Sequence, residues 1–126
     1  MSPMKVLLVD DMQSMRQIMS HLVRSCGHEA TEADCGMKAL RMLESIRFDL
    51  ILSDWNMPGM TGTELVKAIR VKNKTTPIVM VTAESDRQRV LELREIGVNG
   101  YLVKPFQQGA LVAVLNRVFA PVAVAS

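Results

Sequence analysis

The chain has 126 residues, 48% of them hydrophobic, and a formal net charge of +2. This length predicts one domain that buries roughly two thirds of its unfolded surface. The net charge is too small to indicate a nucleic-acid partner, and no apolar run reaches the roughly 18 residues of a membrane span. The first strand signal follows Lys5 directly, which leaves no room for a signal peptide. We therefore expect a soluble cytoplasmic protein without a membrane partner.

Strand and helix signals alternate five times along the chain. The strand signals are short apolar runs bounded by turn residues, at residues 6–9, 50–52, 78–81 and 101–103, with a weaker one at 28–32. A helical stripe follows each of them, over residues 12–25, 37–46, 61–69, 85–96 and 108–119. This alternation predicts a doubly wound, flavodoxin-like α/β domain, with a five-stranded parallel sheet in the order 2-1-3-4-5 and five helices.

Polar residues follow four of the predicted strands. Asp10 and Asp11 follow the first, Asp54 follows the third, Thr82 the fourth and Lys104 the fifth. All carboxyl ends of a parallel sheet lie on one edge, so these side chains should converge there, at the switch point between strands 1 and 3. Three carboxylates, a hydroxyl and an ammonium group suit a divalent cation and a phosphoryl group.

The carboxylates indicate the metal. Packed together, Asp10, Asp11 and Asp54 would raise one another's pKa unless a cation were bound. Mg²⁺ prefers such hard oxygen ligands, and no histidine or cysteine lies near these strand ends, which disfavours a transition metal. Capping of the following helix is the alternative role for Asp10 and Asp11.

The same residues favour phosphoryl transfer. A carboxylate can attack phosphorus and form an aspartyl phosphate, and a metal with Lys104 would neutralise the charge that develops. The Thr82 hydroxyl could hydrogen-bond a phosphoryl oxygen. The sequence contains neither nucleotide-binding motif, GxGxxG or GxxxxGK[ST], and it lacks the GxSxG elbow of serine hydrolases.

Separated segments along the whole chain resemble the receiver domain of response regulators in two-component signalling. They are Asp10-Asp11 and residues 53–62, 81–84 and 104–106. Within the family, residues 54–62 and 81–84 look most like the single-domain chemotaxis regulators. The resemblance implies a phosphorylation-activated switch in chemotaxis or flagellar control. Such a protein is not an enzyme, apart from catalysing its own phosphorylation and dephosphorylation.

The resemblance also implies roles at the metal site. Asp54 would accept a phosphoryl group from a histidine kinase. Mg²⁺ would be held directly by Asp11, Asp54 and the main-chain carbonyl of Asn56, and through a water by Asp10.

Further residues match positions that contact the phosphoryl group or respond to it. Thr82 and Lys104 would be the contacts, and Tyr101 would change rotamer on activation. Asn56 and Glu84 would tune the rate of dephosphorylation.

The target surface implied by the resemblance is the helix Ser85–Ile96, the strand carrying Tyr101 and the last helix. We expect Val112 and Val114 to form an exposed apolar strip there, because they cannot all face inward with the other apolar residues of that helix. An exposed strip usually marks a contact surface, so it predicts a hydrophobic target contact, or a dimer of the otherwise monomeric protein after phosphorylation. Trp55 is expected to be partly exposed beside the site.

Two alternatives remain open. The chain ends at Ser126, straight after the last helix, and we expect residues 1–126 to form a single receiver domain with no output domain. One alternative is a phosphorelay intermediate that passes its phosphoryl group to a histidine phosphotransfer protein. The other is a receiver module excised from a larger regulator.

Overall fold

The computed structural model describes residues 3–83, 95–104 and 106–119. The strands are β1 (Lys5–Val9), β2 (Glu29–Ala33), β3 (Leu50–Asp54), β4 (Ile78–Ala83) and β5 (Gly100–Lys104). The helices of the described residues are α1 (Gln13–Ser25), α2 (Gly36–Ser45), α3 (Gly62–Lys72) and α5 (Gln108–Val118). Among these helices, none is long and apolar enough to cross a membrane.

All five strands are parallel and lie in the order β2-β1-β3-β4-β5, which confirms the predicted sheet. The predicted number of helices is not matched, because the described part of the chain contains four. The helix expected over Ser85–Ile96 lies almost wholly within residues 84–94, outside the described residues.

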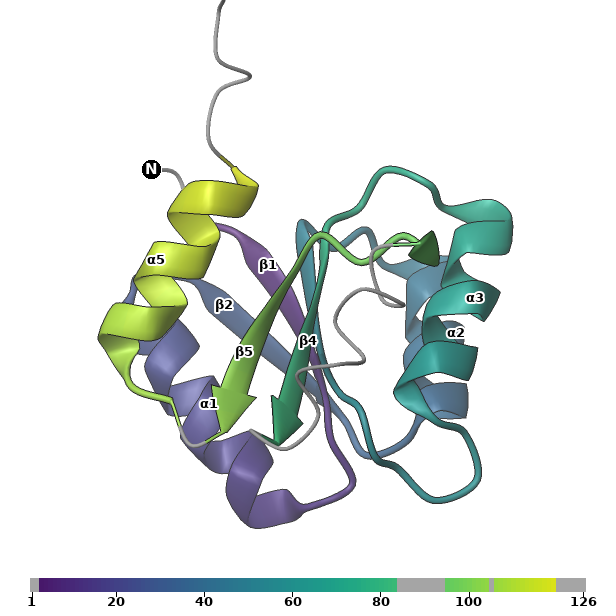
Figure 1. Ribbon diagram of the computed structural model, residues 1–126, viewed down its shortest axis with the longest axis horizontal. Coiled ribbons are helices and arrows are strands. Elements are labelled where there is room, and N and C mark those ends of the chain that lie inside the picture. Colours follow the sequence, from purple (N-terminus) through teal and green to yellow (C-terminus); the bar gives the residue numbers. More distant parts are fainter. Residues whose placement is uncertain (1–2, 84–94, 105, 120–126) are drawn as a thin grey trace, which may run out of the picture.

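The helices cover both faces of the sheet, α1 and α5 on one side and α2 and α3 on the other (Figure 1). Alternate residues of each central strand therefore enter separate cores. Leu7 packs with residues of α3 such as Leu65, whereas its neighbour Leu8 packs with residues of α1 and α5 such as Met19. Because both faces are buried, the central strands are continuous apolar runs instead of alternating ones.

Gly62 allows α3 to begin directly against the end of β3. Its N–H donates to the main-chain carbonyl of Trp55 at 2.7 Å. A Cβ atom at this position would lie 2.9 Å from the carbonyl oxygen of Asp54 and 3.0 Å from the Cα of Trp55. Thr61 caps the helix, because its Oγ1 accepts from the N–H of Glu64 at 3.2 Å and its own N–H donates to the Glu64 carboxylate. The tight approach fixes the chain that follows Asp54.

We predict that Gly62→Ala lowers the free energy of unfolding by about 1–3 kcal/mol, because backbone atoms must move to admit the methyl group. Gly109→Ala is the matched control in another helix: a Cβ there meets nothing within 4 Å. Alanine is the better helix former, so this variant should gain up to about 1 kcal/mol. Urea unfolding of both variants measures the difference, and equal stabilities would contradict the close-approach argument.

Two side chains expected at the surface are buried. Val114 is only 2% exposed, because its Cγ2 lies above Gly100 of β5, where a Cβ atom would come within 3.2 Å of it. The missing side chain lets α5 lie flat on the strand. Trp55 is 6% exposed and belongs to the core on the α2 and α3 side. The expected apolar strip was therefore wrong for Val114, and on α5 only Val112 of the pair remains exposed.

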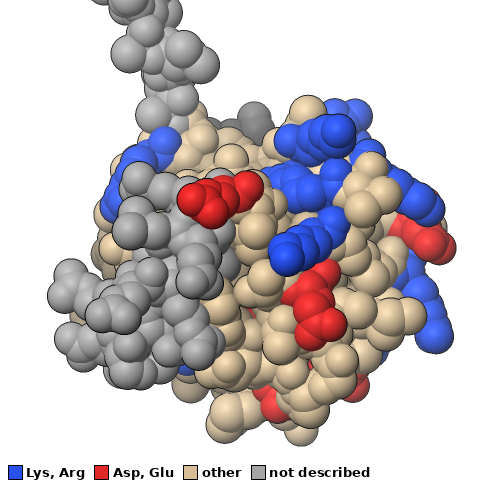
Figure 2. Space-filling view, turned by 45° about the vertical axis from the view of Figure 1, so that its right-hand side comes forward, with Lys and Arg blue, Asp and Glu red and all other residues tan. Residues whose placement is uncertain are grey.

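Basic side chains gather on the face that includes α3 (Figure 2). Helix α3 and the loop after it contribute Lys67, Arg70, Lys72 and Lys74. Arg70 and Lys72 occupy the last turn of α3, where cations stabilise the negative end of the helix dipole. This end lies at the amino edge of the sheet, opposite the edge where the strands end in acidic residues.

Candidate metal centre

Three carboxylates meet at the carboxyl edge of the sheet. Oxygen atoms of Asp10, Asp11 and Asp54 all lie within 4.8 Å of one another. Asp10 and Asp11 follow β1, and Asp54 ends the neighbouring strand β3, whose register pairs Val9 with Ser53. The site thus forms at the predicted switch point, where crossovers leave in opposite directions and helices leave the edge open.

Lys104 reaches this cluster from β5. Its Nζ lies 2.7 Å from Oδ1 of Asp54 and 3.8 Å from Oδ2 of Asp10. The side chain of Asp54 is 7% exposed, against 23% for that of Lys104, so this is a largely desolvated ion pair. Such pairs are strong only when further contacts satisfy the remaining groups.

Asp10 is the least satisfied member of the cluster. It is completely buried; its Oδ1 accepts from the N–H of Met12 at 2.9 Å, but its Oδ2 has no hydrogen-bond donor among the described residues. Burial raises the pKa of the Asp10 carboxyl, and the charges of Asp54 and Asp11 raise it further, against the opposing effects of the Met12 N–H and Lys104.

These features fit a divalent cation. Three carboxylates against one ammonium group leave a formal charge of −2 in the cluster. Within it, Oδ2 of Asp10 is buried and accepts no hydrogen bond from the described residues. Oxygen-only ligands that keep several coordination positions for water are the environment that Mg²⁺ prefers. The residues present could therefore hold Mg²⁺.

We predict that Asp10→Asn raises the free energy of unfolding of the metal-free protein by about 0.5–2 kcal/mol, the usual range for a stabilising substitution. The folded-state pKa of Asp10 lies above its ordinary value of 3.8. The folded protein therefore binds more protons between the two pKa values, and its stability falls as the pH rises through the folded pKa.

Urea unfolding in EDTA, over a pH series that begins near the ordinary pKa of 3.8 and rises to neutral pH, measures this dependence. The pH dependence should flatten in Asp10→Asn, whereas Asp34→Asn, an exposed control at the same edge, should keep it. If the free energy of unfolding of the metal-free wild-type protein increased as the pH rose above 3.8, a raised pKa for Asp10 in the folded protein would be contradicted.

The structure places the other predicted residues as follows. Thr82 is 2% exposed and lies one position beyond Val81, the partner of Asp54 in the sheet. Tyr101 is half-buried on β5, opposite Met80. Asn56 is exposed, two residues after Asp54. Glu84 lies outside the described residues.

Sequence reasoning missed Arg16 and Glu32. Nη1 of Arg16 donates to the main-chain carbonyl of Asp10 at 2.8 Å, and its Nε donates to Oε1 of Glu32 at 3.1 Å. Glu32 sits on β2, beside the residue whose carbonyl accepts the N–H of Asp10. The spacing between Arg16 and Glu32 carries no periodic signal, because the two residues lie on different elements, α1 and β2, that meet only in the folded protein.

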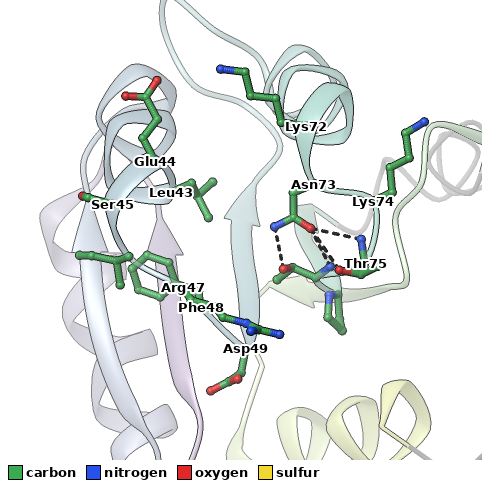
Figure 3. Close-up of a pocket in the computed structure, with 13 residues that line it drawn as sticks. Leu43, Glu44, Ser45, Arg47, Phe48, Asp49, Lys72, Asn73, Lys74 and Thr75 are labelled. Carbon is green, nitrogen blue, oxygen red and sulfur yellow. Dashed lines mark hydrogen bonds between the residues drawn. The ribbon is translucent and has the colours of Figure 1, made fainter.

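A hollow of about 930 Å³ lies at the opposite edge, between the loops that follow α2 and α3. Its polar groups are used to shape these loops. Asn73 binds Thr75 and Thr76 (Figure 3), and Asp49 accepts the N–H of Lys5 at 2.8 Å. Lys72 and Lys74 are exposed, and in the same view the side chain of Lys74 points away from the other residues drawn. We therefore assign the chemistry to the acidic cluster and not to this hollow.

A family model described as the response regulator receiver domain matches residues 6–116. The chain therefore belongs to the response regulator receiver domain family, which confirms the resemblance drawn from the motifs. Receiver domains are signalling modules of two-component systems and not enzymes in the ordinary sense.

Its relatives include chemotaxis proteins. The chain is 47% identical over 119 residues to the chemotaxis protein CheY of Pseudomonas aeruginosa, covering 92% of this chain and 96% of that protein. Chemotaxis protein CheY-3 of Vibrio cholerae is 46% identical, with 92% of each chain covered. The solved structure of the chemotaxis response regulator CheY4 of Vibrio cholerae matches with a TM-score of 0.86 and 44% identity, over 93% of this chain and 99% of that one. The fold is therefore CheY-like.

Proposed function

We propose that this protein is a phosphorylation-activated switch of chemotactic signalling, in which Asp54 accepts a phosphoryl group from a histidine kinase. The observation that supports this best is the arrangement of Asp54 itself. Its carboxylate is nearly buried, contacts Lys104 at 2.7 Å and shares a cluster with two further carboxylates. A nucleophile, a cation for the transferred charge and a metal site thus lie together.

Each residue has a distinct part in this proposal. Asp11, Asp54 and the carbonyl of Asn56 would hold Mg²⁺, with Asp10 acting through a water. When bound, Mg²⁺ neutralises phosphoryl oxygens. Asp54 attacks phosphorus, and a P–O bond to its carboxylate forms while the bond to the leaving group breaks. Lys104 stabilises the charge on the transferred group.

The switch would pass from Thr82 to Tyr101. The phosphoryl group adds about −1.5 to −2 charges at Asp54, and the Thr82 hydroxyl can donate to one of its oxygens. A shift of Thr82 toward the phosphoryl group vacates space beside β5, where Tyr101 is half-buried. The face formed by β5 and α5 would then change its affinity for a protein target.

The lifetime of the phosphoryl group tests the proposal against a phosphorelay intermediate. Incubation with acetyl phosphate and Mg²⁺ should add the mass of one phosphoryl group, and EDTA should prevent it. We predict that phosphate release then takes seconds to minutes. The exposed Asn56 leaves room for a water in line with the departing Asp54 oxygen. Glu84, outside the described residues, is the other residue that the resemblance matches to tuning of this rate.

Phosphate release that takes hours would favour the relay, because an intermediate must protect its phosphoryl group until transfer. The same sample tests target binding: a switch should bind its target only when phosphorylated. The length of the natural reading frame distinguishes a stand-alone regulator from a receiver module excised from a larger protein. No adduct in the presence of Mg²⁺ would contradict the proposed function itself.

A further inference from the structure

Arg16 holds the turn that carries two of the three carboxylates. Its guanidinium donates to the carbonyl oxygen of Asp10 and to Glu32, at 2.8 and 3.1 Å. The Arg16 side chain is only 15% exposed, although arginine is mostly found at the surface. A planar guanidinium can make both bonds at once, because its donors have a fixed fork geometry.

The carbonyl that Arg16 binds belongs to the peptide bond between Asp10 and Asp11. Two further polar atoms of Asp10 are held as well, since its N–H donates to the carbonyl of Ala33 at 3.2 Å and its Oδ1 accepts from the N–H of Met12. Because a peptide unit is planar, fixing this carbonyl also fixes the positions of the N–H and Cα of Asp11. Asp11 is exposed, and no hydrogen bond to another described residue orients its carboxylate. The peptide plane therefore sets the point on the backbone from which the Asp11 side chain reaches the cluster.

Glu32 removes an electrostatic penalty of this arrangement. An uncompensated guanidinium next to Asp10 would repel a divalent cation. The ion pair with Glu32 makes the two side chains neutral as a unit, so the orienting donor adds little repulsion at the metal site.

We propose that Arg16 is a positioning residue of the metal site, which orients Asp11 through the Asp10–Asp11 peptide while Glu32 cancels its charge. The inference rests on the proposed Mg²⁺ site. The inference predicts that Arg16 influences the geometry of the metal site more than the charge of the site. Arg16 should therefore favour Mg²⁺ over a cation with looser geometric demands.

The test replaces Arg16 with lysine, which keeps the charge but loses the planar fork. Mg²⁺ and Ca²⁺ are titrated separately into ¹⁵N-labelled protein, and amide shifts give both affinities. We expect Mg²⁺ affinity to fall by about tenfold, as for other outer contacts of metal ligands. Ca²⁺ affinity should fall less, because Ca²⁺ accepts more varied geometries. Arg24→Lys, at an exposed position of the same helix, is the control and should change neither affinity.

Unchanged Mg²⁺ affinity in Arg16→Lys would overturn the inference, and so would an equal loss for both cations, which indicates a change in charge or a general structural effect. If Arg16→Lys does not fold, Glu32→Gln decides. Its amide oxygen keeps the contact while the charge of Arg16 becomes uncompensated, so both affinities should fall by the same factor, and a preferential loss of Mg²⁺ would overturn the inference. Absence of Mg²⁺ binding by the wild-type protein is a different failure, that of the proposed metal site itself.

Discussion

Asp54→Asn is expected to abolish phosphorylation. The amide keeps the volume of the side chain and can still accept from Lys104, but it has no anionic oxygen to attack phosphorus. Asp54 is also the only carboxylate of the cluster within hydrogen-bond distance of the Lys104 ammonium group, at 2.7 Å. Neither Asp10 nor Asp11 therefore has the same charge stabilisation for a transferred group.

Intact-mass measurement after incubation with acetyl phosphate and Mg²⁺ gives the result directly. Asp34→Asn, which removes an exposed carboxylate near the same edge, is the control and should be phosphorylated like the wild type. An adduct on Asp54→Asn at the wild-type rate would show that another residue is the acceptor. A folded spectrum of the variant excludes loss of structure as the cause.

Lys104→Met is expected to change phosphoryl transfer and metal binding in opposite directions. Transfer should slow by about 100-fold or more, the usual effect of removing one group that stabilises developing negative charge. Mg²⁺ affinity should rise by at least about tenfold, because a cation within 4 Å of Asp54 and Asp10 no longer competes with the metal. The pKa of Asp10 should move further upward, since Lys104 is one of the groups that lower it.

Stopped-flow phosphorylation and Mg²⁺ titration measure the two effects on one protein sample. Lys74→Met, an exposed lysine at the opposite edge of the sheet, should alter neither quantity. If the rate of phosphoryl transfer and the Mg²⁺ affinity both fell in Lys104→Met, the prediction would be contradicted. Lys104 would then be needed for the structure of the site and not for its charge balance.

The sequence alone determined the sheet and the composition of the site. Buried parallel strands must be apolar along their whole length, so a run such as residues 50–52 can be recognised as a strand from its own residues alone. Parallel strands also place all their carboxyl ends on one edge. The sequence therefore predicts that Asp10, Asp54 and Lys104 lie close together, from their positions after each run, and their side chains are neighbours in the structure.

Only the tertiary structure decided which faces are covered and which ions pair. Val114 is buried because α5 folds back over β5, where Gly100 has no side chain. Arg16 pairs with Glu32 only because α1 packs against β2 in the folded protein. The lack of a hydrogen-bond donor at Oδ2 of Asp10 is set by how β1, β3, β5 and the turn at Met12 lie relative to one another. Strand and helix periods are local properties of the chain, whereas burial and ion pairing depend on partners that the strand order brings together across the sheet.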